Sequence, residues 1–332
     1  MKLIESINKN GIPDSLIFSF SENQYYAIWG FDEILSIGIN DLDTNKSINL
    51  FQNKINDWKK NSSNVAAIGY FSYDAKKLFY PHIKFKLPIS SMPLIWFGKP
   101  RKVIKIDRDD IVKLNNNNKM FLKKSLNLKN LNHYKNKIKT IKSYLKAGDV
   151  YQINYTMKKK FKINNKPIDI YLNMRQRAKP KFGYYLELED LSILSFSPEQ
   201  FFKIENNNIF SYPMKGTRPR SSDKKQDLIF KNDLKKSEKD KAEHLMIVDL
   251  LRNDIGKISK YGTVNVKDLF NVESFETVHQ MVSEVSGILK NNINETKIIK
   301  ALFPGGSITG APKESAMKII DKIENYERNI YT

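Results

Sequence analysis

The segment 195–220 places a carboxylate and a lysine at two turns, and both residue types can take part in covalent chemistry. Glu199 follows an apolar run and a proline, and Lys215 lies in the sequence YPMKGTRPR at 212–220. Proline restricts the backbone and glycine lets it approach a ligand closely. We therefore expect this segment to present Lys215 beside the two arginines that follow it.

Lysine attacks a carbon centre only in its neutral form, which burial and neighbouring positive charges favour. Lys215 in such a setting is a candidate nucleophile. The alternative is an ordinary basic loop residue, since the chain has a net charge of +20. These residues alone leave both interpretations open.

A second carboxylate stands at the head of a predicted helix that begins near residue 238. The run 245–248, followed by two leucines, makes this helix apolar on nearly all sides, which predicts burial. A buried charge is costly unless it is paired or bound to a metal ion. Glu243 is therefore either a salt-bridge residue or a cation ligand.

A glycine-rich turn, FPGGSITG at 303–310, leads into a predicted helix that begins at Pro312. A turn at the N-terminus of a helix offers unpaired backbone N–H groups to an anion. The Gly-Lys-Ser/Thr of a P-loop and the G-x-G-x-x-G of a Rossmann fold are both missing. A carboxylate is the ligand we expect here.

Composition narrows the function classes. The 332 residues are 40% hydrophobic and 11% aromatic, which is enough for one large core or two domains. There is no cysteine, so thiolate chemistry and thiolate metal sites are excluded. The N-terminal residues lack the apolar core of a signal peptide, and no apolar run is long enough to span a membrane. We expect a cytoplasmic protein with no membrane partner.

The lysines are spread along the chain without a nucleic-acid-binding motif, so we expect no nucleic-acid partner.

Alternating and helical patterns indicate a mixed fold. Short strands are predicted at 16–20, 25–29, 66–73, 94–98, 150–155 and 208–211. An amphipathic helix is predicted to end at Gly148, and helices dominate from about residue 235.

Six blocks, in order along the chain, carry a resemblance to a known family: AGDVYQIN (147–154), SPE (197–199), PMKGTRPR (213–220), EHLMIVDLLRNDIG (243–256), QMVSEVSG (280–287) and FPGGSITGAPK (303–313). Together they closely resemble the chorismate-utilising enzymes. The resemblance implies an α+β fold of packed antiparallel sheets flanked by helices, as in anthranilate synthase component I and aminodeoxychorismate synthase. We expect residues 1–125 to form a variable β-rich region and residues 126–332 the chorismate-binding region, and the two segments can belong to one fold. The family continues beyond the position of Thr332 with further strands and a last helix. The resemblance therefore implies either a fragment or truncated reading frame, or a partner that supplies these elements, and without them we expect little or no activity.

The residue types at two positions distinguish family members that catalyse different reactions. Gln152 stands where enzymes that add water to chorismate carry a lysine, which favours the aminating branch. Lys215 stands where anthranilate-forming members typically have alanine, which favours 4-amino-4-deoxychorismate as the product. Many anthranilate-forming relatives have a histidine at the position of Gln280. We do not transfer its role to the adjacent His279, because neighbouring residues usually point in different directions.

The resemblance also implies a role for each site residue. Lys215 attacks the chorismate ring, Glu199 protonates the leaving hydroxyl group, ammonia then displaces the lysine, and Glu243 binds Mg²⁺. The expected substrate-binding residues are Gln152, Gly216, Thr217, Gly305, Gly306, Thr309, Gly310 and Lys313. Ammonia would come from a separate glutamine amidotransferase subunit. Two alternatives remain: an anthranilate-forming enzyme and a catalytically inactive chorismate-binding remnant.

Overall fold

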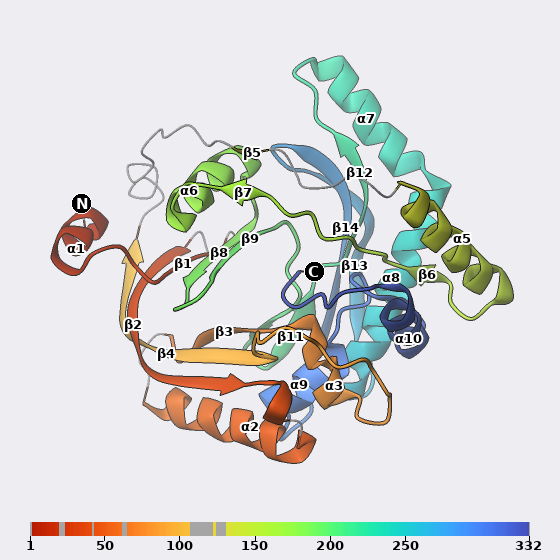
Figure 1. Ribbon diagram of the computed structural model, residues 1–332. Coiled ribbons are helices and arrows are strands. Elements are labelled where there is room, and N and C mark those ends of the chain that lie inside the picture. The colour runs from red at the N-terminus through yellow and green to blue at the C-terminus, as the bar shows by residue number, and fades with distance from the viewer. Residues whose placement is uncertain are drawn as a thin grey trace.

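The computed structural model describes residues 2–19, 24–41, 43–61, 65–106, 122–123 and 131–331. A six-stranded antiparallel sheet has the strand order β3-β4-β2-β1-β8-β9 (Figure 1). Its strands are β1 (Ser15–Ser19), β2 (Gln24–Ile37), β3 (Ile68–Phe71), β4 (Ile95–Ile106), β8 (Phe182–Glu187) and β9 (Ser192–Ser197). Since β1 pairs with β8, residues on both sides of the expected boundary at 125 contribute to one sheet.

A second antiparallel sheet is built around one long strand. The strand β14 (Val278–Ile288) pairs with β11 (Asn208–Ser211), β12 (Met214–Pro219) and β13 (Asn265–Ser274), and β10 (Lys203–Glu205) extends the sheet beyond β11. Buried residues alternate with partly exposed ones along most of β14, but residues 281–283 are all buried. This sheet carries Lys215.

Helices cover both sheets. The helix α2 (Thr44–Lys60) packs Phe51, Ile55 and Trp58 against strands of the first sheet. The helices α8 (Glu238–Ile258) and α9 (Glu295–Leu302) cover the second sheet, where Ile247, Leu251 and Val285 share one core cluster (Figure 1). The other helices are α1 (Lys2–Asn10), α3 (Lys76–Phe79), α5 (Leu131–Ala147), α6 (Pro167–Ala178), α7 (Lys224–Lys236) and α10 (Lys313–Ile323).

Short strands fix the segment around the glycine-rich turn. The strand β15 (Gly310–Ala311) pairs with β6 (Gln152–Ile153), and β5 (Leu122–Lys123) pairs with β7 (Lys162–Ile163). The predicted strand 150–155 is thus limited to two residues. Beyond α10 the chain returns to the first sheet, where the Tyr73 N–H donates to the carbonyl of Asn329 at 2.5 Å. The pairing of β15 with β6 places the block that contains Gln152 beside the glycine-rich turn.

The helix α8 is less buried than its sequence predicts. Ile247, Val248 and Leu251 are buried, but the side chain of Leu245 is 49% exposed. One face lies on the second sheet and the opposite face is accessible, because the sheet covers only one side of the helix.

In the part of the chain that the structure describes, no helix has the length and apolar character needed to cross a membrane.

Candidate functional site

Glu199 lies in the segment that follows β9, two residues after the strand ends. Its backbone N–H donates to the Ser197 hydroxyl at 3.3 Å, and that hydroxyl donates to the Glu199 carbonyl at 2.9 Å. Burial raises the pKa of the Glu199 carboxyl group to about 7, although three groups oppose this effect: the Ser307 hydroxyl, the charge of Lys215 and the Met214 N–H. Loss of hydration therefore outweighs the local hydrogen bonds and charge. A carboxyl group with this pKa can donate a proton near neutral pH.

Lys215 lies on β12 opposite Met281 of β14 and is partly buried. Directly after it, the register of β12 against β14 shifts at Gly216, which has a φ of +70°. A side chain at Gly216 would also press on Leu234 of α7, whose Cδ1 atom would lie 2.6 Å from the added Cβ. A bulge of this kind changes the direction in which neighbouring side chains point. Gly216 thus acts through the backbone, by setting the local geometry beside Lys215.

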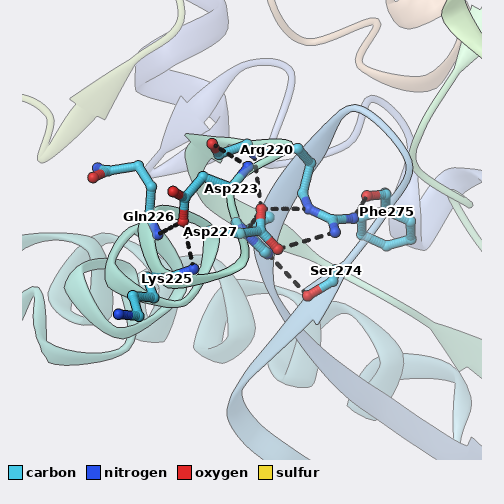
Figure 2. Close-up of polar contacts among 9 residues, drawn as sticks. Arg220, Asp223, Lys225, Gln226, Asp227, Ser274 and Phe275 are labelled. Atoms are coloured by element: carbon cyan, nitrogen blue, oxygen red, sulfur yellow. Dashed lines mark hydrogen bonds and ion pairs between the residues drawn. The ribbon is translucent and has the colours of Figure 1, made fainter.

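The two arginines after Lys215 are both engaged by carboxylates. Arg218 pairs with Asp233 at 2.5 Å and with Asp240 at 3.1 Å. Arg220 forms two hydrogen bonds to Asp227, at 2.8 and 3.0 Å (Figure 2). The sequence predicts that both arginines act on Lys215 as neighbouring positive charges, and in the fold carboxylates of α7 and α8 balance those charges.

His279 and Gln280 point in different directions. The imidazole of His279 is buried between Ser274 (Nδ1 to Oγ, 2.9 Å) and Asp227 (Nε2 to Oδ1, 3.0 Å). The side chain of Gln280 reaches Thr217, with Nε2 at 3.5 Å from Oγ1. His279 thus belongs to the ion-pair cluster around Arg220, and Gln280 and Thr217 face each other across β12 and β14.

A second histidine lies close to Lys215 and was not singled out from the sequence. His244 on α8 is fully buried, and its Nε2 atom is 2.7 Å from the Ser283 hydroxyl. Burial, and to a lesser degree the charge of Lys215, lower the pKa of His244 to about 4. The imidazole is therefore neutral at physiological pH.

The glycine-rich turn contacts Glu199 through Ser307, whose hydroxyl hydrogen bonds with the carboxyl group. Inside the turn, the buried Thr309 hydroxyl donates to the Gly305 carbonyl at 2.9 Å. Added side chains at two glycines would meet other segments: at Gly305 the ring of Phe201 at 3.2 Å, and at Gly306 the side chain of Leu250. In this structure Thr309 closes the turn and the glycines allow it to pack tightly.

Gln152 and Gly310 lie on paired strands. Gly310 has a φ of +142°, and a side chain there would collide with the Gln152 carbonyl oxygen. The Gln152 Oε1 atom is buried, and no described residue donates a hydrogen bond to it. A buried amide oxygen without a partner is a candidate acceptor for a substrate or for ammonia.

Lys313 makes structural contacts with two other helices. It is 8% exposed, and its Nζ donates to Asp254 of α8 at 2.5 Å and to the Leu302 carbonyl at the end of α9 at 3.0 Å. Burial lowers the pKa of Lys313, and the Asp254 carboxylate opposes this effect. Lys313 joins three helices, which favours a structural role over the substrate-binding role expected from the sequence.

Glu243 is more exposed than expected for a buried ligand. Its side chain is 42% exposed, and the nearest recorded cation is Lys239 Nζ, at 3.9 Å one helical turn earlier. Among the described residues, no three His, Asp or Glu side chains are grouped closely enough to hold a metal ion. Magnesium is commonly held by one or two carboxylates together with water and substrate oxygens. Glu243 fits that limited role, as a single protein ligand.

Ser307, Asn154 and His244 are the site residues that sequence reasoning missed, although all three lie inside the blocks quoted above. Ser307 stands within FPGGSITG and Asn154 within AGDVYQIN, and in the fold the Asn154 Nδ2 atom donates to the Ser307 carbonyl at 2.6 Å. Only their contacts in the folded chain distinguish them from ordinary polar residues.

Comparisons with known proteins identify a family and a fold. A family model described as chorismate binding enzyme matches residues 15–332. The anthranilate synthase component 1 of Saccharolobus solfataricus is 33% identical over 282 residues, which is 80% of this chain and 65% of that protein. The aminodeoxychorismate synthase component 1 of Salmonella typhimurium is 41% identical over 198 residues, 60% of this chain and 44% of that protein. The chain thus spans less than two thirds of the length of either relative.

A solved structure is similar over the whole chain. A putative 2,3-dihydroxybenzoate-specific isochorismate synthase, DhbC, from Bacillus anthracis aligns with a TM-score of 0.75 and 19% identity, covering 100% of this chain and 82% of that one. This similarity confirms the predicted fold class of packed antiparallel sheets flanked by helices.

Proposed function

The chain belongs to the chorismate binding enzyme family, and on that premise we propose that it is a component I of aminodeoxychorismate synthase, which aminates chorismate at C4. The observation that carries this proposal is the proximity of Lys215 and Glu199. A primary amine and a carboxyl group with a pKa of about 7 act on one another from two different elements. A relative named for this activity is 41% identical to the chain over 198 residues.

The reaction proceeds in two displacements. After loss of a proton, the amine of Lys215 forms a C–N bond to the chorismate ring, the ring double bonds shift, and the C4–O bond breaks. Glu199 donates its proton to the departing oxygen, which leaves as water. Ammonia then forms the C4–N bond, the double bonds shift back, and the lysine leaves. The covalent intermediate divides one difficult substitution into two easier ones.

Other residues bind and orient the substrate. The Oε1 atom of Gln152, which has no hydrogen-bond partner among the described residues, is placed to accept a hydrogen bond. Thr217 lies on the same strand as Lys215, and Gln280 lies on the neighbouring strand β14. The walls of the proposed substrate site are formed by backbone groups of Gly216, Gly305, Gly306 and Gly310. Glu243 is the proposed Mg²⁺ ligand, and the ion, when bound, would neutralise a substrate carboxylate. A glutamine amidotransferase subunit supplies ammonia, and this chain has no cysteine that could perform that reaction.

The second candidate function is anthranilate formation. It is favoured by the 33% identity that an anthranilate synthase component 1 shows over 80% of this chain. That reaction releases pyruvate and gives a 2-amino product, so the two candidates differ in products that can be separated.

The test is incubation of a form of the protein that includes the further strands and last helix of the family with chorismate, Mg²⁺ and ammonium, followed by mass spectrometry of the products and of the protein. We expect 4-amino-4-deoxychorismate without pyruvate, and an adduct on the peptide that contains Lys215. Anthranilate with pyruvate would establish the second candidate. Chorismate binding without any product would indicate the inactive chorismate-binding protein.

A further inference from the structure

The part of the glycine-rich turn that touches Glu199 is held from two sides by residues outside the turn. Asn154, just after β6, donates from Nδ2 to the Ser307 carbonyl at 2.6 Å. Arg328, beyond α10, donates from Nη1 to the Ile308 carbonyl at 2.9 Å. Two consecutive carbonyls of the turn are therefore fixed by side chains from two distant segments.

Arg328 also fixes Asn154. Its Nη2 atom donates to the Asn154 carbonyl at 2.6 Å, and the Asn154 N–H donates to the Thr309 carbonyl at 2.8 Å. The guanidinium, the turn and the segment after β6 thus form one continuous set of hydrogen bonds. A guanidinium suits this role, because its five donors have a fixed planar arrangement.

The arginine is held in turn by a buried carboxylate. Arg328 is 1% exposed and pairs with both carboxylate oxygens of Glu324, at 2.8 and 2.7 Å. Glu324 also accepts from the Thr156 N–H at 2.9 Å. Taking two charges out of water is costly, so a hydrophobic pair could serve packing at least as well. A buried ion pair at this place is better explained by the geometry that it imposes on the carbonyls of residues 154 and 308.

The position of the Ser307 backbone decides where its hydroxyl lies. That hydroxyl hydrogen bonds with the Glu199 carboxyl group. A small displacement of the turn would lengthen this bond, and hydrogen bonds weaken steeply outside their preferred geometry.

We propose that Asn154 and Arg328 are positioning residues that hold the turn 305–309 so that the Ser307 hydroxyl stays on the Glu199 carboxyl group. The catalytic importance of this arrangement rests on the function proposed above, but the arrangement itself involves only the protein. Neither residue has a part in the two displacements proposed above.

The experiment follows the titration of Glu199 directly. Protein labelled with ¹³C at the glutamate carboxyl carbons is titrated by NMR, and the Glu199 resonance is assigned by its absence in Glu199→Gln. Ser307→Ala removes a donor to the ionised carboxylate, so the midpoint should rise by about one pH unit. Asn154→Ala should raise it in the same direction. The double variant should show no further rise beyond Ser307→Ala, because both changes remove the same hydrogen bond. Lys215, the charge that acts on Glu199 from β12, is present in every variant.

Asn173→Ala is the matched control. Asn173 makes the same kind of contact, from Nδ2 to the Asp169 carbonyl at 2.8 Å, on the helix α6. Its replacement should leave the midpoint of Glu199 unchanged. A midpoint that moves with Ser307→Ala but not with Asn154→Ala would overturn the proposal, and so would full additivity of the two shifts. No shift with Ser307→Ala would overturn it as well.

Arg328→Lys keeps the positive charge but removes the planar guanidinium, which donates to the carbonyls of Ile308 and Asn154. We expect the midpoint of Glu199 to rise while circular dichroism stays that of the folded protein. If Arg328→Lys does not fold, the proposal is tested by Ser307→Ala, Asn154→Ala and their double variant. Turnover of chorismate with ammonium, measured in parallel, separates the two proposals. Coupled shifts without any amination would reject the function and keep the positioning roles.

Discussion

Lys215 and Glu199 come from different sheets and nevertheless act on one another: the ammonium of Lys215 lowers the pKa of a carboxyl group that burial raises to about 7. Lys215 lies on β12 of the second sheet, and Glu199 follows β9 at the edge of the first. The site therefore exists only when the two sheets are packed together. It combines a potential nucleophile with a potential proton donor.

Replacing Lys215 tests the covalent route. Lys215→Ala should slow the formation of 4-amino-4-deoxychorismate by about 10³-fold or more, as the loss of a nucleophile usually does. Substrate binding, measured by calorimetry, should persist. Ammonia could then attack the ring carbon that the lysine had occupied, so a 2-amino product is the expected minor species.

Lys215→Arg is the control for charge. It keeps a cation beside Glu199 but cannot act as a nucleophile, so its rate should resemble that of Lys215→Ala. Unchanged 4-amino product in either variant, with no adduct in the mass spectrum of the wild-type protein, would show that Lys215 is an ordinary basic residue.

The raised pKa of Glu199 predicts a pH dependence of stability. Its folded-state pKa of about 7 exceeds the ordinary value of 4.5, so the folded protein holds a proton that the unfolded chain releases. The stabilisation that this proton gives is complete below pH 4.5 and is lost as the pH rises through 7. Glu199→Gln has no such proton. Between pH 5 and 8 the wild type should therefore lose stability relative to Glu199→Gln in urea unfolding, and its amination rate should fall above pH 7. Parallel stability curves for the two proteins would contradict the raised pKa.

Much of the fold could be predicted from local patterns. The alternating segments near residues 16–20 and 25–29 became β1 and β2, and the amphipathic helix that the sequence ends at Gly148 became α5. The family resemblance predicted the fold class, which the structural similarity confirms. Patterns of this kind are visible because each depends only on neighbours in the chain.

Features that depend on distant partners could not be predicted. Asp254, which engages Lys313, lies 59 positions earlier in the chain, and Asp227 lies 52 positions before His279. The sequence shows a lysine and a histidine, but not that helices bring carboxylates to them. Glu243 was expected to be buried because α8 is rich in apolar residues, whereas only one side of the helix is covered. The role of Glu243 in binding Mg²⁺ stays a prediction.

Removal of the Lys313 ammonium should destabilise the fold. Lys313→Met leaves the buried Asp254 carboxylate with a single partner, Lys257 at 2.8 Å. Breaking a buried pair typically costs about 3 kcal/mol, and the remaining partner reduces this figure to about 2 kcal/mol. The control is Lys257→Ala: this side chain is 58% exposed, so its loss should cost less than about 1 kcal/mol. Equal losses in the two variants, measured by urea unfolding, would show that Lys313 is not the principal partner.

Magnesium dependence tests Glu243. Glu243→Gln should raise the Mg²⁺ concentration needed for half-maximal activity by about tenfold, because a neutral amide is a weaker ligand than a carboxylate. Glu238→Gln is the control on the same helix, since Glu238 is exposed and pairs with Lys241. If both variants keep the wild-type dependence on Mg²⁺, Glu243 is not a ligand.

The pairing of β15 with β6 predicts a strict need for glycine at position 310. Its φ of +142° is unfavourable for other residues, and the Cβ of an alanine would collide with the carbonyl oxygen of Gln152. Gly310→Ala should therefore separate the two strands, displace Gln152 and Ser307 together, and lower kcat/KM by about 100-fold, since small misplacements of positioning groups have effects of this size. Gly256→Ala is the matched control. No heavy atom outside its own helix lies within 4 Å of a Cβ added there, so alanine should stabilise α8 by about 0.5–1 kcal/mol and leave the rate unchanged. Wild-type kinetics in Gly310→Ala would show that the pairing of these two short strands does not position the site.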